Sequence, residues 1–466
     1  MALYKFLILL HLPWLVSELV SSHPVWSWFI AWTGSLLIFY LTLLSPWSIH
    51  QEDRPLVHQV MRPLILIQLI FAGFMCCTSV FYFADQMVHA YTPDSEVLAQ
   101  CQRLSLLAHT ALVSGFILLT KPHHSPGYQK TISTGDLALR LCLITYGMTL
   151  LLDYFQPMIQ FKYNLLCISM CSGTFLLING LANKNIKHIG FGSLVFGLNL
   201  LHSTLTGYKE SILVNFLLLG FIAFPYFKKT VLILSIPGIA ILLYVLPTFT
   251  AIIRLQSWTE KKPVEQARAD AYLSLLEEDN EEEINVNNWK FLINRSSEIG
   301  MFSKFVHHVP DHHPYYGWEI LKNSCIALIP RALWQEKPIT EKIAMQRVYE
   351  AGVANPASSV SAKSRPVVDA YLTAGAPGVY LCILIYGLLT QWLCNTAERL
   401  FGGYELGCMI TFNGIFQQLW RGNNFEFILN NILYGYILMV LTFLILKQFK
   451  ILIPIAHENN SHLPIL

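Results

Sequence analysis

The segment CIALIPRALWQEKP, Cys325–Pro338, places a guanidinium, an indole, a carboxylate and an ammonium beside an apolar run. The planar guanidinium of Arg331 can bind phosphate oxygens at two points, so one interpretation is that it binds a diphosphate. The other interpretation is that Arg331 extends to lipid phosphates and that Lys337 is an ordinary surface residue. In either case Trp334 suits the boundary between lipid and water, where tryptophan is enriched.

A short helix must position these side chains. The apolar centre of Trp318–Trp334 is too short to cross a bilayer, which needs about 20 apolar residues. We therefore predict a helix that lies in the outer interface and is stopped by Pro330, because proline disfavours helical geometry in the residue before it. Arg331 then lies at the depth of the lipid headgroups.

A second polar cluster, HHVPDHHPYYGW, precedes this helix. It contains His307, His308, Asp311, His312 and His313. Two histidine pairs at this spacing match no standard zinc motif, and two prolines break the helix that such a motif needs, so we predict no metal ion. The alternatives are that one histidine binds sugar or accepts a proton, or that the cluster is a solvated loop.

The composition predicts a membrane protein. Of 466 residues, 54% are hydrophobic and 13% are charged, and the mean hydropathy is +0.47. A soluble domain usually carries about 25% charged residues. Hydropathy predicts an all-α polytopic fold with about 12 transmembrane helices. These lie near residues 4–20, 24–46, 62–83, 104–120, 137–156, 164–182, 189–206, 210–226, 230–253, 375–395, 403–420 and 427–448.

The distribution of lysine and arginine predicts the topology, because cytoplasmic loops carry an excess of both. The short loops on one side hold Arg54, Arg62, Lys121, Lys130, Lys184, Lys187, Lys228, Lys229 and Arg399, whereas those on the other side hold only Arg103, Lys162, Lys209 and Arg421. Both termini are therefore predicted in the cytoplasm. The predicted parts are nine helices in 1–253, a large outer loop in 254–374, and three helices with a cytoplasmic tail in 375–466.

The outer loop gathers most of the polar chemistry. Its cations include Arg295, Arg347, Lys363 and Arg365, of which Arg295 and Arg365 flank the central segments and could either bind an anion or be surface charges. The run Glu277–Glu283 predicts a solvated, mobile segment. Asp369 and Tyr371 open the next span, where the carboxylate could bind sugar hydroxyls or cap the helix.

Three ordered segments resemble the oligosaccharide repeat-unit polymerases known as Wzy-type O-antigen polymerases. ALIPRALWQEKP (327–338) is similar to their signature of Ile-Pro-Arg followed by a tryptophan, an acidic residue and Lys-Pro. HPYYGWEIL (313–321) resembles the aromatic and glycine segment before that signature. VVDAYLTAGAPGVYLCILIYG (367–387) is similar to the acidic, tyrosine and glycine entry into the next span. Gln335 and Glu336 depart from the usual Pro and Asp.

The resemblance implies a metal-independent glycosyltransferase of GT-C-like architecture in a bacterial inner membrane, without a cofactor or a nucleic-acid partner. It implies that a growing glycan moves from its undecaprenyl-diphosphate carrier to the terminal sugar of a new lipid-linked unit, with a chain-length regulator as a further partner. Cations must then meet charge on the leaving diphosphate, and a carboxylate or imidazole must take a hydroxyl proton. We predict Arg331, Glu336 and Asp369 as catalytic residues. The predicted substrate contacts are Lys209, Arg295, Trp334, Lys337, Arg365, Tyr371 and His313.

Two other functions fit parts of the sequence. An O-antigen ligase would share the architecture and the donor and use a lipid A-core acceptor. A non-catalytic transporter or flippase would place functional polar groups near the membrane midplane, where His109 and His202 are the candidates. The weak match of TGYKES (206–211) to a Ser-Arg pair leaves Lys209 either as an anion contact or as a cap of a helical hairpin.

Overall fold

The computed structural model describes residues 3–455 apart from most of 155–160 and 242–280, and apart from 90–93, 121–125, 206–208, 296, 332 and 357–361. Within this part the chain is almost entirely helical, and two short strands form one antiparallel pair. Seven helices are long and apolar enough to cross a membrane. The prediction of an all-α membrane protein is therefore confirmed.

These seven candidate spans account for part of the predicted set. They are α2 (Pro24–Phe39) with η1 (Tyr40–Leu44), α3 (Pro63–Ala72) with η3 (Gly73–Cys77) and α4 (Ser79–His89), α5 (Ser95–Leu119), α6 (Thr134–Leu152), α7 (Lys162–Asn183), α17 (Pro366–Leu400) and α20 (Phe425–Gln448). The other predicted spans fall on α1 (Leu3–Leu19), α8 (Ile186–Leu205), α9 (Lys209–Ala223), α10 (Lys228–Ala240), and α18 (Tyr404–Phe412) with η8 (Asn413–Gln417) and α19 (Gln418–Trp420). The number of twelve remains a prediction.

Helix α5 is the centre of the bundle and packs between α2 and α17. Its residues are buried on nearly every side, as expected of an apolar helix surrounded by other helices. Small residues bring the α5 and α17 backbones together, since a Cβ on Gly115 would lie 2.6 Å from the carbonyl oxygen of Leu384. Glycine at such crossings permits close helix packing inside a membrane. A glycine also allows α7 and α8 to pack closely, since a Cβ on Gly192 would lie 2.5 Å from the backbone nitrogen of Leu177.

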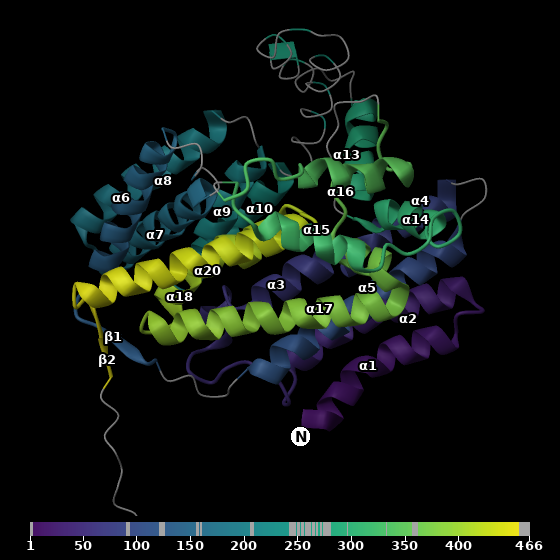
Figure 1. The fold of residues 1–466 in the computed structure, drawn as a ribbon, viewed down its shortest axis with the longest axis horizontal. Helices are drawn as coiled ribbons and strands as arrows, with labels where there is room; N and C mark the ends of the chain where they lie inside the picture. The colour runs from purple at the N-terminus through teal and green to yellow at the C-terminus, as the bar shows by residue number, and fades with distance from the viewer. Residues whose placement is uncertain are drawn as a thin grey trace, which may run out of the picture.

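One end of the bundle carries the strands β1 (Tyr128–Lys130) and β2 (Leu452–Pro454), which pair with each other. The ends of α5 and α17 meet here, because Asn395 donates to the carbonyl of Leu119 at 2.8 Å. Helix α20 also ends here, since β2 follows it and the backbone of Gly127 bonds both Arg399 and Ile455, the residue after β2. Helices α17 and α20 therefore run in the same direction and lie side by side (Figure 1). The short η2 (Leu56–Gln59) precedes α3 at this end.

The opposite end carries the polar segment, drawn in green in Figure 1. It consists of α13 (Glu281–Arg295), α14 (Ile299–His308), α15 (Trp318–Leu328) and α16 (Thr340–Glu350). Helix α15 packs along α20, α14 packs against α5, and α13 packs against α4. The predicted short helix is therefore present as α15, which ends two residues before Pro330, and its position at the membrane interface remains a prediction.

Two local features refine the predicted boundaries. Residues 277–280 lie outside the described part, while Glu281–Glu283 are helical and belong to α13. Helix α17 begins at Pro366, before the predicted loop ends, and is kinked at Ala374 and Gly375. Gly375 has φ of 65°, a conformation that favours glycine.

Candidate functional site

Asp369 lies at the centre of a buried polar cluster at this end of the bundle. Its side chain is 0% exposed and belongs to the first turn of α17. One carboxylate oxygen accepts from the Ser364 hydroxyl at 2.5 Å, and the other accepts from the backbone N–H of Phe425 at 2.8 Å. Asp369 therefore links the start of α17 to the start of α20.

Arg347 and Glu426 complete this cluster. Nη2 of Arg347 in α16 lies 2.9 Å from Glu426 and 3.5 Å from Asp369, and both partners are almost fully buried. Burial opposes the charged guanidinium, but the two carboxylates outweigh it and raise the pKa of Arg347 above its usual range. The guanidinium therefore stays charged. Nε of Arg347 and one oxygen of Glu426 are buried without a hydrogen-bond partner.

Arg365 forms a second ion pair, with Glu298 at the start of α14. Its guanidinium also donates to the carbonyl of Leu419 at 3.4 Å and lies over the Phe74 ring, 5.2 Å from its centroid. Gly422 is required beside it, because a Cβ there would lie 1.9 Å from the guanidinium. Arg365 therefore joins α14, α17 and the loop before α20.

Lys363 extends the row of cations on the segment before α17. Its ammonium donates to Asn423 at 3.2 Å and lies 3.9 Å from the centroid of the Phe427 ring. Lys363 and Arg365 thus both contact the short loop between α19 and α20.

The segment that follows α15 holds its charged side chains in different environments. Lys337 is largely buried and donates to the carbonyls of Ala327 and Ile329, at 2.8 Å each. Burial, and next the nearby Arg331, lower the pKa of Lys337. This lysine binds the C-terminal carbonyls of α15, which otherwise lack helical partners. Arg331 and Glu336 are exposed, and Arg331 donates to the carbonyl of Lys337 at 3.5 Å.

Five of the predicted site residues therefore form two groups. Asp369 and Arg365 lie close to each other and to Arg347 and Glu426. The exposed group is Arg331, Trp334 and Glu336 beyond α15, which none of the described hydrogen bonds or ion pairs joins to Asp369.

Aromatic residues connect the polar segment to the kink of α17. The Tyr371 hydroxyl donates to the carbonyl of Val309 at 2.7 Å, and its ring meets that of Tyr315 edge-on. The His313 ring stacks on Tyr316, with centroids 4.3 Å apart, and Tyr316 donates to Glu350 at 2.9 Å. Tyr371 is thus held by the backbone, whereas His313 stays partly exposed.

The histidines lie close together on the surface. The His308 ring is 5.8 Å from that of His312 and 6.2 Å from that of His313. Partial burial, and next the two other histidines, lower the pKa of His308. Within the described residues no group of three or more potential ligands could hold a metal ion.

Two further predicted contacts are described by their backbones alone. Lys209 is the first residue of α9, and Arg295 is the last residue of α13. The side chains of both lie outside the described part.

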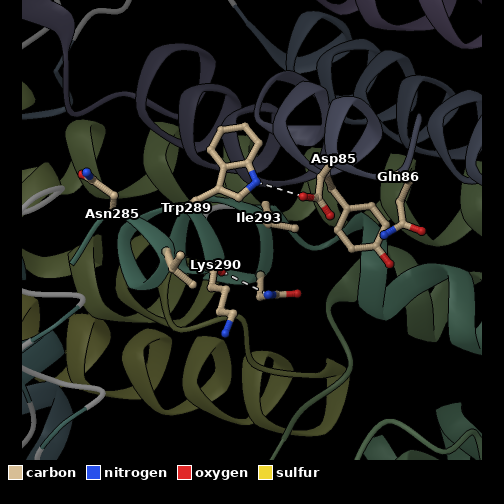
Figure 2. Close-up of a pocket in the computed structure, with 9 residues that line it drawn as sticks. Asp85, Gln86, Asn285, Trp289, Lys290 and Ile293 are labelled. Carbon is tan, nitrogen blue, oxygen red and sulfur yellow. Dashed lines mark hydrogen bonds between the residues drawn. The ribbon is translucent and has the colours of Figure 1, made fainter. Parts of the chain in front are cut away.

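A separate pocket of about 600 Å³ lies between α4 and α13. Figure 2 shows Trp289 of α13 beside Asp85 of α4, and the indole N–H donates to the carboxylate at 2.8 Å. Tyr82 and Gln86 of α4 and Asn285 of α13 also line it. None of these residues was predicted from the sequence.

Comparison with known proteins identifies the family. Residues 12–454 match a family described as a domain of unknown function, DUF8712. The chain belongs to this family. The DUF8712 unit therefore includes both the helical bundle and the polar segment. No curated protein matches the chain, and no solved structure matches it.

Two central residues of this DUF8712 protein, Arg347 and Glu426, carry little signal in the sequence. Glu426 stands in the first turn of an apolar helix, where a carboxylate ordinarily stabilises the helix start. Arg347 stands among polar residues of α16 and resembles a surface charge. An available signal was that Glu426 follows Asn423 and Asn424, which make an unusually polar entry into a span.

Proposed function

We propose that this protein is a membrane glycosyltransferase that polymerises oligosaccharide repeat units carried on undecaprenyl diphosphate. The reaction would occur at the outer face of a bacterial inner membrane, with both termini in the cytoplasm. About 12 spans and a GT-C-like architecture belong to this proposal. The partners would be a lipid-linked donor, a lipid-linked acceptor and a chain-length regulator.

One observation carries the proposal: the three segments that resemble the polymerases form one connected unit. The backbone N–H of Tyr316 donates to Leu372 at 2.9 Å, and that of Gly317 donates to Thr373 at 3.0 Å. These bonds join segment 313–321 to segment 367–387. Helix α15 leads from segment 313–321 into segment 327–338, which contains Arg331. The sequence resemblance thus corresponds to a spatial cluster at one end of the bundle.

The exposed group beyond α15 suits the chemistry of the reaction. A hydroxyl oxygen of the acceptor sugar attacks the anomeric carbon, and the bond from that carbon to the lipid diphosphate breaks. Arg331, which none of the described ion pairs neutralises, binds the diphosphate as its negative charge increases. The exposed carboxylate of Glu336 takes the hydroxyl proton. Trp334 holds the segment at the lipid boundary.

The buried cluster has a positioning role in this proposal. Asp369 already binds Ser364, Phe425 and Arg347, so its carboxylate is not available as a base. Arg347 is likewise balanced by two carboxylates and is a poor ligand for a further anion. Lys337 is engaged by α15 and acts by fixing the direction of the segment that carries Arg331.

The described residues offer less support for a transporter. A proton path needs a chain of polar groups across the membrane. His109 is fully buried in α5 against the Phe39 ring, and neither of its ring nitrogens has a hydrogen-bond partner. Within the described residues, no side chain therefore continues such a path from His109.

Deletion of the gene in its bacterial host, followed by gel analysis of the surface glycan, tests the proposal. A polymerase predicts that a ladder of chain lengths is replaced by a single repeat unit, and that the plasmid-borne gene restores the ladder. Loss of every attached unit would instead identify a ligase. An unchanged glycan would exclude both enzymes.

A further inference from the structure

The pocket between α4 and α13 has the size and the lining of a ligand site. Its volume of about 600 Å³ falls within the range of small-molecule sites, about 300–1,000 Å³. Such sites combine aromatic surface with a few polar groups that fix the orientation of the ligand. Here Trp289 and Tyr82 supply the rings, while Asp85, Gln86 and Asn285 supply the polar groups.

The polar groups suit a ligand with many hydroxyls. The amides of Gln86, Asn285 and Asn294 each provide donors and an acceptor, which is the combination that a hydroxyl requires. Asp85 is oriented by the Trp289 indole, which occupies one carboxylate oxygen. A pyranose presents C–H groups on its faces and hydroxyls on its rim. The aromatic rings match those faces, and the amides match the rim.

The charges in the pocket argue against an anionic ligand. Asp85 and Lys290 are the only ionisable carboxylate and ammonium in its described lining, and they balance each other. Lys290 extends away from the Asp85–Trp289 pair (Figure 2). The polar rim beside the rings is therefore neutral to acidic, which disfavours a phosphate and favours an uncharged saccharide.

The pocket adjoins the polar cluster through α14. The Tyr82 ring packs so closely on Gly300 that a Cβ there would overlap it. Two residues earlier, Glu298 pairs with Arg365. One end of the pocket therefore touches the helix that holds Arg365 in place.

We infer that the α4–α13 pocket binds a neutral oligosaccharide. The identification of this saccharide as the growing glycan rests on the proposed function. The binding of a saccharide does not depend on that function. Held there, several sugars of one chain would stay on the protein between successive additions.

Purified full-length protein in detergent is titrated with neutral oligosaccharides of four to eight sugars, released by mild acid from the host's surface polysaccharide. Binding is followed by isothermal titration calorimetry, which does not depend on the tryptophan that is removed. Saturable binding is expected, unaffected by inorganic pyrophosphate. Trp289→Ala should weaken it by about tenfold or more, an amount equivalent to one ordinary tryptophan contact. Asn285→Ala changes an exposed position of α13 to a better helix former and should weaken binding by severalfold.

The matched control is Trp392→Ala, which removes an exposed tryptophan near the strand end of α17, at the other end of the bundle from the pocket, and should leave the affinity unchanged. Absence of saturable binding, or equal affinities of wild type, Trp289→Ala and Asn285→Ala, overturns the inference. The gel separates this result from the proposed function. If the protein is a polymerase, Trp289→Ala should shorten the glycan ladder and keep the single attached unit. If deletion of the gene leaves the glycan unchanged, the polymerase is refuted, and the titration alone decides whether the pocket binds a saccharide.

Discussion

Two buried arginines, one at each end of the bundle, each meet two carboxylates but in different geometries. At the strand end, Arg62 binds Asp53 at 2.6 and 2.8 Å and Glu398 at 2.9 and 2.8 Å, using both oxygens of each. At the polar end, Arg347 reaches Asp369 and Glu426 through Nη2 alone. Its Nε and one oxygen of Glu426 are left without a partner.

The difference separates a structural clamp from a cluster at the end that carries the predicted site residues. Paired, fully hydrogen-bonded charges hold elements together, and Arg62 joins the start of α3 to the end of α17. Buried polar groups without partners are uncommon and need an explanation. Polar groups that lack hydrogen-bond partners are expected near functional sites. The Arg347 cluster lies at the end that carries the segments resembling the polymerases.

The first prediction asks which end faces outward, and its effect is all or none. Cysteine in place of the exposed Glu282 of α13, in a Cys325→Ser background that removes an exposed native thiol, should react with an impermeant thiol reagent in intact spheroplasts. Cysteine in place of Lys187, exposed in the first turn of α8, should react only after lysis. The opposite pattern would put the polar end in the cytoplasm and remove the proposed mechanism.

The second prediction tests the clamp. Arg62→Leu leaves Asp53 and Glu398 without their counter-charge, and breaking a buried pair in this way typically costs about 3–5 kcal/mol. We expect the amount of folded protein in the membrane to fall sharply, as measured by fluorescence-detected size exclusion in detergent. Arg399→Leu, an exposed position at the same end, is the control and should accumulate normally. Normal accumulation of Arg62→Leu would mean that the clamp is dispensable.

The third prediction concerns activity at the polar end. Arg331 is exposed, so Arg331→Ala should accumulate normally, yet loss of a donor to developing charge typically costs about 10²–10³ in rate. Arg331→Lys should stay clearly impaired, because lysine cannot bind two phosphate oxygens at once. Both are scored by the glycan ladder at matched protein level, with Lys342→Ala as an exposed control. A wild-type ladder from Arg331→Lys would reduce Arg331 to a lipid anchor.

The fourth prediction sharpens the comparison with one conservative change at each end. Arg62→Lys loses two bidentate pairs and should destabilise by about 1.5–3 kcal/mol, whereas Arg347→Lys keeps a single-point contact and should cost about 0.5–1.5 kcal/mol. Thermal unfolding in detergent measures both. Equal losses would show that the two arginines are bound alike in solution.

The last prediction expects no effect. The histidine cluster lies at the polar end, and neither the histidine spacing nor the implied reaction calls for a metal. Glycosyl transfer by the purified protein should therefore persist in EDTA. Loss of turnover that a divalent ion restores would contradict this expectation.

Several features could be predicted from the sequence because they depend on local composition. Long apolar windows predicted membrane helices, since a bilayer satisfies no backbone hydrogen bonds and requires helices that do so internally. The apolar run before Pro330 predicted a helix too short to span, which is α15. The resemblance of three segments singled out the region around Arg331 and Asp369, and the assignment of their roles remains a prediction.

Only the tertiary structure decided which charges meet. Arg347, Asp369 and Glu426 come from three helices. Asp369 lies 22 positions and Glu426 lies 79 positions after Arg347, and no local pattern encodes such a pairing. The sequence grouped Lys337 with Arg331 as two similar cations, but folding buries one against the carbonyls of α15 and leaves the other exposed. Residue type and spacing determine what a side chain can do. Burial and partners, which depend on packing between distant helices, determine whether it is free to do it.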